Sequence, residues 1–530
     1  MTRLAPTIHR SPHAFGPLET VPSLALRHAA DEPTAVVVVD GTTGDTLTRG
    51  ELAARSAALA AGLRSRGIGR GDLVALAMPN VPWWPIAALG VWRAGAAIAP
   101  LSPLWIASEA ARVLGPVRPR LGIGFGPFAP LVRGAFDEAG IDAELFVVGD
   151  GDSGVPVAEL LEEPAGDRFA APAVQLGDLA AVPFSSGTGG LPKGVRLTHR
   201  NIAASAVTAM ESLGCVSAVD DRSTVLACAP FFHSLGMSLT LTGPLSVGAC
   251  IVTLPRPQLQ AVLGPAAKHR VTHMAVPPPM IEGLARDPRV DEHDLSSLAT
   301  VATGGAAVPP HLLREASARL DALVAEGYGI TEATCMVSGP VGRPSTPGTT
   351  GWLVRGTEAR VVDPETGADL PDGEPGELLI RGPQIMEGYH GLADETAAAI
   401  DADGWMRTGD LVAIRPDGQL EIRDRLKELI KVGGASVAPA ELELVLREHP
   451  AVRDAGVIGR PDPQQGEVPV AFVSLAAEAE PGELRTFVAE RVAAYKQLSE
   501  VHLVEELPRL PTGKLLRRAL RERAEAAAPA

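Results

Sequence analysis

Residues 185–194 read SSGTGGLPKG and gather several kinds of phosphate-binding group in one short stretch. Its glycines allow backbone N–H groups to converge on an anion. Ser185, Ser186 and Thr188 add hydroxyl donors, and Lys193 adds a cation. The stretch predicts a phosphate-binding loop, and a flexible turn without a ligand is the alternative.

The sequence on either side predicts an α/β setting for this loop. The apolar residues 179–184 (LAAVPF) predict a strand before it, and a helix is expected to start near residues 198–201. In such an arrangement the N–H groups at the start of the helix can bind an anion. Pro192 stands where a Walker loop needs a glycine before its lysine, and where a dinucleotide-binding fingerprint needs its third glycine. Both of these motifs are therefore excluded.

Around this loop, helical and strand-like segments alternate through the first 350 residues. Residues 51–67 and 81–95 have the pattern of helices, and residues 71–79 and 96–101 have the pattern of strands. The same alternation returns between residues 223 and 308. It predicts parallel sheets with crossover helices.

From about residue 350 the pattern changes to short alternating strands separated by Asp-Gly and Pro-Gly turns. This pattern predicts a small antiparallel barrel or sheet. Residues 425–530 mix helical and strand-like segments and predict a small α+β domain. Because single cores stop growing near about 250–300 residues, a chain of 530 residues is expected to form two or more lobes.

The composition is that of a soluble globular protein, with 46% apolar and 21% charged residues. A net charge of -16 argues against a nucleic-acid or anionic-membrane surface. The N-terminus lacks a signal-peptide pattern, and Arg93 and several prolines interrupt the apolar residues 81–107. We expect a cytoplasmic protein in which this stretch is a buried helix followed by a buried strand. The cysteines lack close pairing or metal-ligand spacing and are expected to be free, buried thiols: Cys215, Cys228, Cys250 and Cys335.

Six motifs in order give the chain a resemblance to a known family. They are SSGTGGLPKG (185–194), PFFHSLG (230–236), EGYGITEAT (326–334), GWMRTGDL (404–411), DRLKELIKVGG (424–434) and LPTGKLLRR (510–518). From about residue 30 to 520 the chain resembles the adenylate-forming superfamily of acyl-CoA synthetases, luciferases and peptide-synthetase adenylation domains. The closest resemblance is to 4-coumarate–CoA ligases and related acyl-CoA synthetases, through PFFH, RGPQIMEGYHG (381–391) and LKELIKVGGASVAPAELE (426–443).

This resemblance implies an α/β fold in two domains. Residues 1–423 would form a large N-terminal domain with two parallel-type sheets, flanking helices and, at about 335–423, a distorted antiparallel barrel. Residues 424–530 would form a small, mobile α+β domain. In the implied reaction a carboxylate attacks the α-phosphate of ATP, releasing pyrophosphate and leaving an acyl-adenylate, and a thiol then displaces AMP. The expected cofactors are ATP, Mg²⁺ and coenzyme A.

The resemblance also assigns residues to the phosphates and the metal. The phosphate loop would contribute Ser185, Ser186, Gly187, Thr188, Gly189 and Lys193. Thr188 and Lys193 would bind the β- and γ-phosphates, and Thr331 the α-phosphate. Glu332, together with Thr188, would bind Mg²⁺, which prefers carboxylate and phosphate oxygens. The family usually has a second threonine where Gly189 stands, so we expect weaker phosphate binding with the chemistry intact.

The base and the ribose have their own expected partners. Tyr328 would lie against adenine, in a slot lined by Glu326 and Gly327. Asp410 would accept hydrogen bonds from both ribose hydroxyls, because a carboxylate has two acceptor oxygens. Arg425 would reach the ribose and the phosphate from the hinge side.

Lys514 resembles the family's catalytic lysine, which bridges the attacking carboxylate and the α-phosphate and neutralises charge as it builds. Asp424 resembles the hinge about which the small domain turns between the two half-reactions. The opposite face of that domain would bind coenzyme A. The residues expected to contact coenzyme A are Lys431, Gly433 and Gly434, with Arg256 and Lys496 as candidates for its phosphates. For the last two, a solvated surface cation is the alternative.

His233 would stand between the acyl site and the thiol tunnel, with a core histidine as the alternative. The rest of the acyl pocket is expected from Leu235, Met237, Gly304, Gly305, Ala306, Gly329 and Ile330. This region has no Asp to pair with an amine, and Leu235 stands where coumarate-like ligases usually have a tyrosine. We therefore expect an acid without a charged amine. An aryl acid of the cinnamate kind and a medium aliphatic or polyunsaturated acid both remain open.

The acceptor is expected to be coenzyme A, and the alternative is that the enzyme loads a separate acyl carrier protein. A non-catalytic binder is a further alternative, against which the survival of Lys193, Glu332, Asp410, Arg425 and Lys514 argues. The expected partners are small molecules, with neither nucleic acid nor integral membrane contact. The chain is expected to be a monomer or a homodimer.

Overall fold

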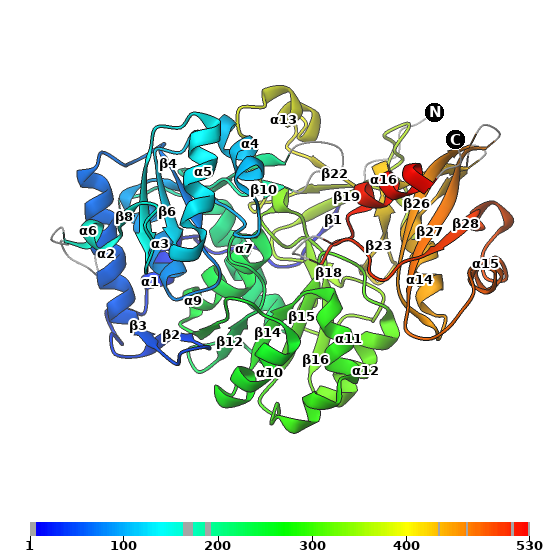
Figure 1. The fold of residues 1–530 in the computed structure, drawn as a ribbon, viewed down its shortest axis with the longest axis horizontal. Coiled ribbons are helices and arrows are strands. Elements are labelled where there is room, and N and C mark those ends of the chain that lie inside the picture. Colours follow the sequence, from blue (N-terminus) through cyan, green and yellow to red (C-terminus); the bar gives the residue numbers. More distant parts are fainter. Residues whose placement is uncertain are drawn as a thin grey trace.

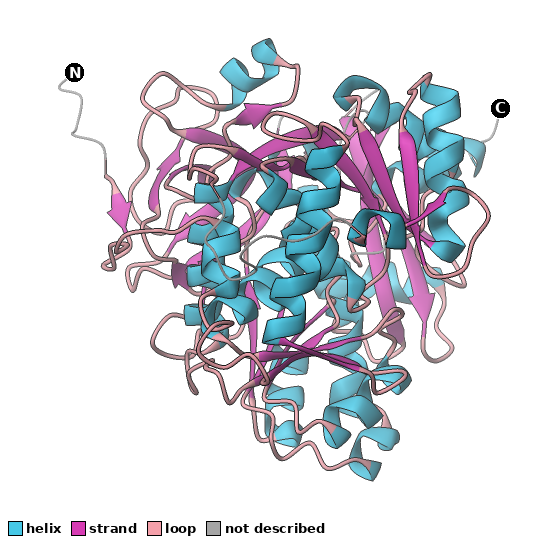
Figure 2. Cartoon of the chain, turned by 90° about the vertical axis from the view of Figure 1, so that its left-hand side faces the viewer, coloured by secondary structure: helices cyan, strands magenta, loops and turns pink. Residues whose placement is uncertain are grey.

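The computed structural model describes residues 7–162, 173–185, 192–432, 435–462, 465–509 and 513–527. Figure 1 shows a large N-terminal body with a smaller C-terminal lobe beside it. Figure 2 shows helices packed between and around the sheets of the body. The expected α/β architecture is confirmed.

The first sheet is mostly parallel. Its strands run in the order β10 (Phe184–Ser185), β11 (Lys193–Thr198), β9 (Leu179–Ala181), β5 (Ala97–Pro100), β4 (Leu73–Ala77), β6 (Leu121–Phe125), β7 (Glu144–Val148) and β8 (Val155–Pro156), and β21 (Gly388–Tyr389) pairs with β11. Alternate residues of β4 point to opposite faces. Val74 and Leu76 share a core with α2 (Arg49–Ser65) and α3 (Trp83–Ala94), whereas Leu73 and Ala75 share one with α4 (Ala107–Val117) and α5 (Ala129–Ala139).

The second sheet is parallel except at one edge. Its strands run in the order β16 (Leu323–Gly327), β15 (Thr300–Gly304), β14 (His273–Val276), β12 (Thr224–Ala227), β13 (Cys250–Thr253), β2 (Val36–Asp40) and the antiparallel β3 (Thr46–Thr48). Leu226 and Val301 pack with α10 (Leu259–Lys268), α11 (Pro278–Arg286) and α12 (Pro310–Leu320). Val225 packs on the other face with α7 (His199–Leu213), which also contacts β9 and β11 and so lies between the two sheets (Figure 1).

The third sheet is antiparallel, as the turn-rich sequence predicts. Its strands run in the order β1 (His9–Arg10), β19 (Glu358–Val362), β20 (Gly376–Arg381), β22 (Met406–Ile414) and β23 (Leu420–Arg425). At its edge the N-terminal β1 pairs with β19, and Arg10 donates to Glu358 at 2.6 Å. A separate small pair is formed by β17 (Ser338–Gly339) and β18 (Trp352–Leu353). Shorter helices of the body are α1 (Val21–Leu26), α6 (Ala158–Leu161), α8 (Ser234–Gly236), α9 (Gly243–Val247) and α13 (Ala393–Ala399).

The C-terminal lobe is a sheet covered by helices on both faces. Its strands run in the order β25 (Ala435–Val437), β24 (Ile430–Val432), β27 (Gly466–Leu475) and β26 (Val452–Asp462), and β28 (Glu500–Leu503) pairs with β27. Val457 and Val473 face α14 (Pro439–Arg447) and α15 (Pro481–Ala489). Ile458 and Phe472 face α16 (Arg517–Ala527). The mixed α+β pattern predicted for this region is confirmed.

The glycine-rich loop has a different setting from the expected one. β11 intervenes between the loop and α7, and it pairs antiparallel with β10, so the loop connects the two strands of a hairpin. The expected strand 179–184 is divided into β9 and β10 around Pro183, which has no N–H to donate to a ladder. The N-terminus of α7 is capped by its own Thr198, whose hydroxyl accepts the N–H of Asn201. The helix itself begins at His199, within the expected residues 198–201, but the expected strand–turn–helix arrangement was wrong because β11 lies between the loop and the helix.

The apolar residues 81–107 contain the expected buried helix and strand, α3 and β5. In the part of the chain that the structure describes, no helix has the length and apolar character needed to cross a membrane. The four cysteines are free, as expected, but only Cys228 and Cys335 are buried, whereas Cys215 and Cys250 are partly exposed.

Candidate active site

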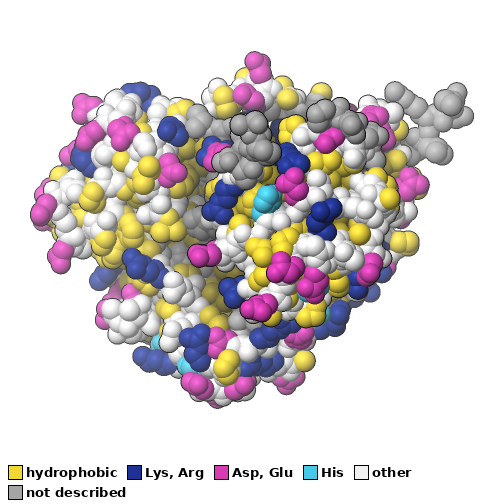
Figure 3. Space-filling model, turned by 45° about the vertical axis from the view of Figure 1, so that its right-hand side comes forward, with side chains coloured by type: hydrophobic (Ala, Val, Ile, Leu, Met, Phe, Trp, Pro, Cys, Tyr) yellow, Lys and Arg dark blue, Asp and Glu magenta, His cyan; other side chains and the backbone are white. Residues whose placement is uncertain are grey.

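A cavity of about 800 Å³ opens at the carboxyl ends of β15 and β16, between the body and the lobe. Parallel α/β sheets bind ligands at this edge. Residues 302–310 and 325–332 of the body line it, and Arg447, Lys514 and Arg517 line it from the lobe. Figure 3 shows the surface hollowed where the lobe meets the body, with lysine and arginine side chains along the hollow.

The structure brings most of the expected acyl-pocket residues to this cavity. Those that line it are His233, Leu235, Gly304, Gly305, Ala306, Gly329 and Ile330. Cys335 and Met336 line it as well, and sequence reasoning missed them. They follow directly after EGYGITEAT, so continuing that motif by two residues would have found them.

Met237 is the exception among the expected acyl-pocket residues. Its side chain is fully buried in the core and does not line the cavity. Residues two apart on a helix point in nearly opposite directions, whereas residues four apart share a face. The helical segment after His233 therefore directs Leu235 and Leu239 into the cavity and Met237 away from it. Leu239 takes the place that the sequence assigned to Met237.

The slot expected for adenine and ribose is formed by the end of β16 and the middle of β22. Glu326, Tyr328 and Asp410 all line the cavity. Tyr328 donates its hydroxyl proton to Asp410 Oδ2 at 2.5 Å, and Arg425 Nε lies 3.1 Å from Asp410 Oδ1. Each carboxylate oxygen thus has one protein partner and keeps one lone pair for a further donor. Glu326 accepts the N–H of Val308 at 3.2 Å.

Burial controls the charge of these groups. It raises the pKa of Glu326 to about 8, against the weaker effects of the Val308 N–H and Arg447, so this carboxyl is neutral at pH 7. Burial also raises the pKa of Tyr328, and the neighbouring Asp410 raises it further. For Asp410, burial raises the pKa while Arg425 opposes the shift.

Thr331 and Glu332 form a short 3₁₀ turn at the cavity wall. Tyr389 donates its hydroxyl proton to Glu332 Oε1 at 3.0 Å, and no lysine or arginine of the described residues forms an ion pair with this carboxylate. Nor do the described residues contain a cluster of acidic, His and Cys side chains that could enclose a metal. A single carboxylate with free acceptor positions fits Mg²⁺, which is usually bound by one or two carboxylates plus substrate phosphates.

The phosphate loop is only partly described. Ser185 lines the cavity, and the Lys193 ammonium lies 4.8 Å from the centre of the Tyr389 ring. Four expected loop residues lie outside the described residues: Ser186, Gly187, Thr188 and Gly189.

The lobe brings Lys514 to the cavity. Gly513, directly before it, packs closely on the body, because a Cβ added at this residue would lie 3.1 Å from Pro279 Cδ. Burial, helped by Arg425, lowers the pKa of Lys514 to about 8, although Asp410 opposes the shift. Burial also lowers the pKa of His233 to about 4, with a further contribution from the charge of Lys514, so this histidine is neutral.

Asp424, the expected hinge, is buried at the end of β23. Its carboxylate accepts the N–H groups of Arg425 at 2.7 Å and of Ala440, in the first turn of α14, at 2.8 Å. Burial raises its pKa to about 6. The carboxylate therefore connects the end of the body's antiparallel sheet to the first helix of the lobe.

The structure does not bring the expected coenzyme A residues to the cavity. Lys431, Lys496 and Arg256 are not among its lining residues. Lys496 is paired with Glu441, whose two carboxylate oxygens lie 2.7 Å from its ammonium nitrogen. Gly433 and Gly434 lie outside the described residues.

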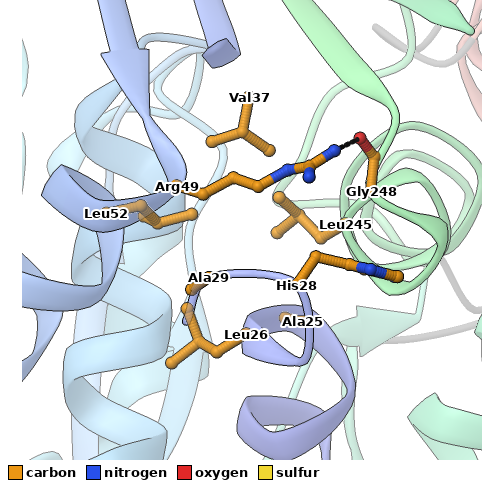
Figure 4. A pocket seen from close by; sticks show the side chains of 9 residues that line it. All are labelled: Ala25, Leu26, His28, Ala29, Val37, Arg49, Leu52, Leu245 and Gly248. Carbon is orange, nitrogen blue, oxygen red and sulfur yellow. Dashed lines mark hydrogen bonds between the residues drawn. The ribbon is translucent and has the colours of Figure 1, made fainter. Parts of the chain in front are cut away.

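A second, much smaller cavity lies away from this site, beside a buried arginine that joins two helical segments. Its volume is about 10 Å³, room for at most one water molecule. Figure 4 shows Arg49 of α2 extended between apolar side chains, with its guanidinium donating to the carbonyl of Gly248 at 2.6 Å. The same guanidinium pairs with Glu32. Arg49 thus bonds α2 to the turn after α9.

Comparison with known proteins places this fold among the adenylate-forming enzymes. The structure aligns with ATP-bound MatB from Rhodopseudomonas palustris at a TM-score of 0.87 and 26% identity, over 96% of this chain and 99% of the other. It aligns with a benzoate CoA ligase from Burkholderia xenovorans LB400 at a TM-score of 0.84 and 28% identity, over 95% and 100%.

The chain belongs to the AMP-binding enzyme family. The model of the AMP-binding enzyme matches residues 26–390, and that of the AMP-binding enzyme C-terminal domain matches residues 441–514. The chain is 36% identical to 4-coumarate–CoA ligase 5 of Oryza sativa subsp. japonica, over 94% of each chain. It is 37% identical to 4-coumarate–CoA ligase-like 9 of the same plant, over 95% of this chain and 92% of the other. The resemblance inferred from the six motifs is confirmed.

Proposed function

We propose that this protein is an AMP-forming acid–thiol ligase, which activates a carboxylic acid with ATP and then transfers the acyl group to coenzyme A. The observation that carries the proposal is the convergence of Asp410, Glu332 and Lys514 on one cavity, the first two from the body and the third from the lobe. The names of the relatives, 4-coumarate–CoA ligase and benzoate CoA ligase, support this acid–thiol chemistry.

Adenylation brings a carboxylate to a polyphosphate, so the main task of the protein is to position two anions and reduce their repulsion. Asp410 and Tyr328 would fix the nucleoside. Lys514 would place its ammonium between the carboxylate and the α-phosphate, where negative charge is brought together. A Mg²⁺ ion bound by Glu332 and the phosphates would withdraw charge from the phosphate oxygens.

The side chains expected to surround the acyl group favour a substrate whose only charge is its carboxylate. Its wall consists of Leu235, Leu239, Met336 and the thiol of Cys335, together with the neutral His233. Burial raises the pKa of the Cys335 thiol to about 12, so it carries no charge. None of these five side chains is an ionised acid that could pair with an ammonium group on the substrate. We propose an aryl or medium aliphatic acid as the substrate.

The decisive experiment is ATP–pyrophosphate exchange with a panel of aryl, aliphatic and amino acids, repeated with coenzyme A and analysed for thioesters. We expect exchange with aryl or aliphatic acids and a matching acyl-CoA product. Exchange without a thioester product would point to a separate carrier protein as the acceptor. Absence of exchange with every acid would refute the proposal and favour a non-catalytic binder.

A further inference from the structure

The resemblance assigns no catalytic or binding role to the motif RGPQIMEGYHG (381–391), yet its backbone is bonded to two parts of the active site. The N–H of Met386 donates to the carbonyl oxygen of Glu332 at 2.8 Å. On the other side, β21 pairs antiparallel with β11, and the N–H of His390 donates to the carbonyl oxygen of Gly194 at 2.8 Å. The segment thus joins the turn that carries Glu332 to the strand that begins at Lys193.

The side chain of Tyr389 repeats this connection. Its hydroxyl donates to Glu332 Oε1 at 3.0 Å, and the ammonium of Lys193 lies 4.8 Å from the centre of its ring, within the range of a cation–π contact. Burial and the charge of Glu332 raise the pKa of this phenol, so it keeps the proton that it donates. One neutral side chain therefore contacts an anion and a cation that come from distant parts of the chain.

The backbone at Tyr389 is fixed by α13. The N–H of Tyr389 donates to Thr396 Oγ1 at 2.9 Å. A Cβ added at the preceding Gly388 would lie 2.6 Å from Thr396 Cγ2, so only glycine fits this approach. The ring and the hydroxyl therefore have a defined position relative to the cavity.

Opposite charges this close to one side chain would be expected to pair directly, but no ion pair joins Lys193 to Glu332 in the described structure. A direct pair would occupy the carboxylate that a metal needs and the ammonium that a phosphate needs. With Tyr389 as their neutral partner, the Glu332 carboxylate stays available to a metal and the Lys193 ammonium to a phosphate.

We propose that Tyr389 is a positioning residue for nucleotide-bound metal: its hydroxyl orients the Glu332 carboxylate, and its ring places the Lys193 ammonium. The inference rests on the proposed function, because it presumes an ATP-using site. It adds a residue to which the resemblance assigned no role.

The test separates the two contacts with two variants. Tyr389→Phe removes the hydroxyl and keeps the ring, whereas Tyr389→Leu removes both. Binding of Mn²⁺ is measured by the loss of its free electron paramagnetic resonance signal, with a non-hydrolysable ATP analogue present. Binding of the analogue alone is measured by calorimetry in EDTA. Tyr495→Phe, at an exposed tyrosine of the lobe, is the matched control.

We expect Tyr389→Phe to weaken Mn²⁺ binding about tenfold, as for loss of a hydrogen bond to a charged group, and to leave metal-free binding of the analogue unchanged. Tyr389→Leu should in addition weaken the metal-free binding about two- to fivefold, as for loss of a cation–π contact. The melting temperature of each variant is recorded alongside.

Unchanged Mn²⁺ binding by Tyr389→Phe would overturn the inference. So would an equal loss of Mn²⁺ and metal-free binding in both variants together with a lower melting temperature, because the residue would then act only through folding. Failure of the proposed function is distinguishable, since the wild-type protein itself would then bind neither Mn²⁺ with the analogue nor the analogue alone.

Discussion

The acidic groups expected to bind ATP on the body side of the cavity and the lysine expected to act from the lobe side differ in their partners. On the body side, Asp410 is bonded to Tyr328 and Arg425, and Glu332 is bonded to Tyr389. On the lobe side, no hydrogen bond or ion pair joins Lys514 to the described residues, and burial lowers its pKa to about 8. Groups expected to contact ATP throughout the reaction thus have fixed partners, whereas the lysine expected to act in a single step has none.

The substitution with the largest expected effect is Lys514→Ala. We expect it to reduce ATP–pyrophosphate exchange by about 10²–10³, the scale of losing one donor to a transition state. ATP binding should change little, because the partnered groups of the body remain. Lys268→Ala, at an exposed lysine of α10, is the control. Undiminished exchange in Lys514→Ala would refute the assignment of this lysine.

Asp410→Asn tests whether the body side of the cavity binds the nucleoside. Loss of the carboxylate charge removes charge-assisted hydrogen bonds and leaves Arg425 without its partner, so we expect the KM for ATP to rise about 10–100-fold. Asp369→Asn provides a matched control, because Asp369 also pairs with an arginine, Arg360, at 2.8 Å and does not line the cavity. An ATP KM within twofold of the wild-type value in Asp410→Asn would show that the nucleoside is bound elsewhere.

The pH dependence connects the two sides. Lys514 acts as an ammonium, which is present below its pKa of about 8, so the rate of exchange should fall about tenfold per unit as the pH rises beyond that value. Because the charge of Asp410 raises this pKa, Asp410→Asn should move the fall to lower pH. A pH profile that is flat between pH 7 and 10 would contradict the role of Lys514.

The smallest expected effect concerns the phosphate loop. Gly189→Thr would add a hydroxyl donor, and we expect it to lower the KM for ATP about 5–30-fold, equivalent to about 1–2 kcal/mol, at an unchanged kcat. If the substitution instead abolishes activity, the glycine is needed for close approach of the backbone, and the interpretation of a weakened contact is wrong.

Most of the fold could be predicted from local patterns. The alternation of apolar segments predicted α3, β5 and the parallel sheets, and the Asp-Gly turns predicted the antiparallel sheet. The strand β11 was missed because its reason to exist is not local. It pairs with β9, β10 and β21, two of which lie outside its own hairpin, and strand preference depends on such partners.

The site residues could be predicted where a short motif alone indicates the role of its residues. EGYGITEAT, RTGD and PTGK placed Glu326, Tyr328, Glu332, Asp410 and Lys514, and the structure brings all five to the cavity. Met237 was misplaced because a sequence window does not give the direction of each side chain on a helix. Tyr389 was overlooked because its two partners are distant in sequence. The pairing of β21 with β11 brings it to Lys193, and the backbone bond from Met386 to Glu332 brings the other partner.

The pairing of strand β1 can form only late in synthesis of the chain. Arg10 pairs with Glu358, 348 residues further along. At a synthesis rate of about 5–20 residues per second, the first strand waits roughly 20–70 s on the ribosome before its partner exists. During that interval the N-terminal residues are free to contact chaperones or other chains, so the speed of translation can influence how much correctly folded protein is made.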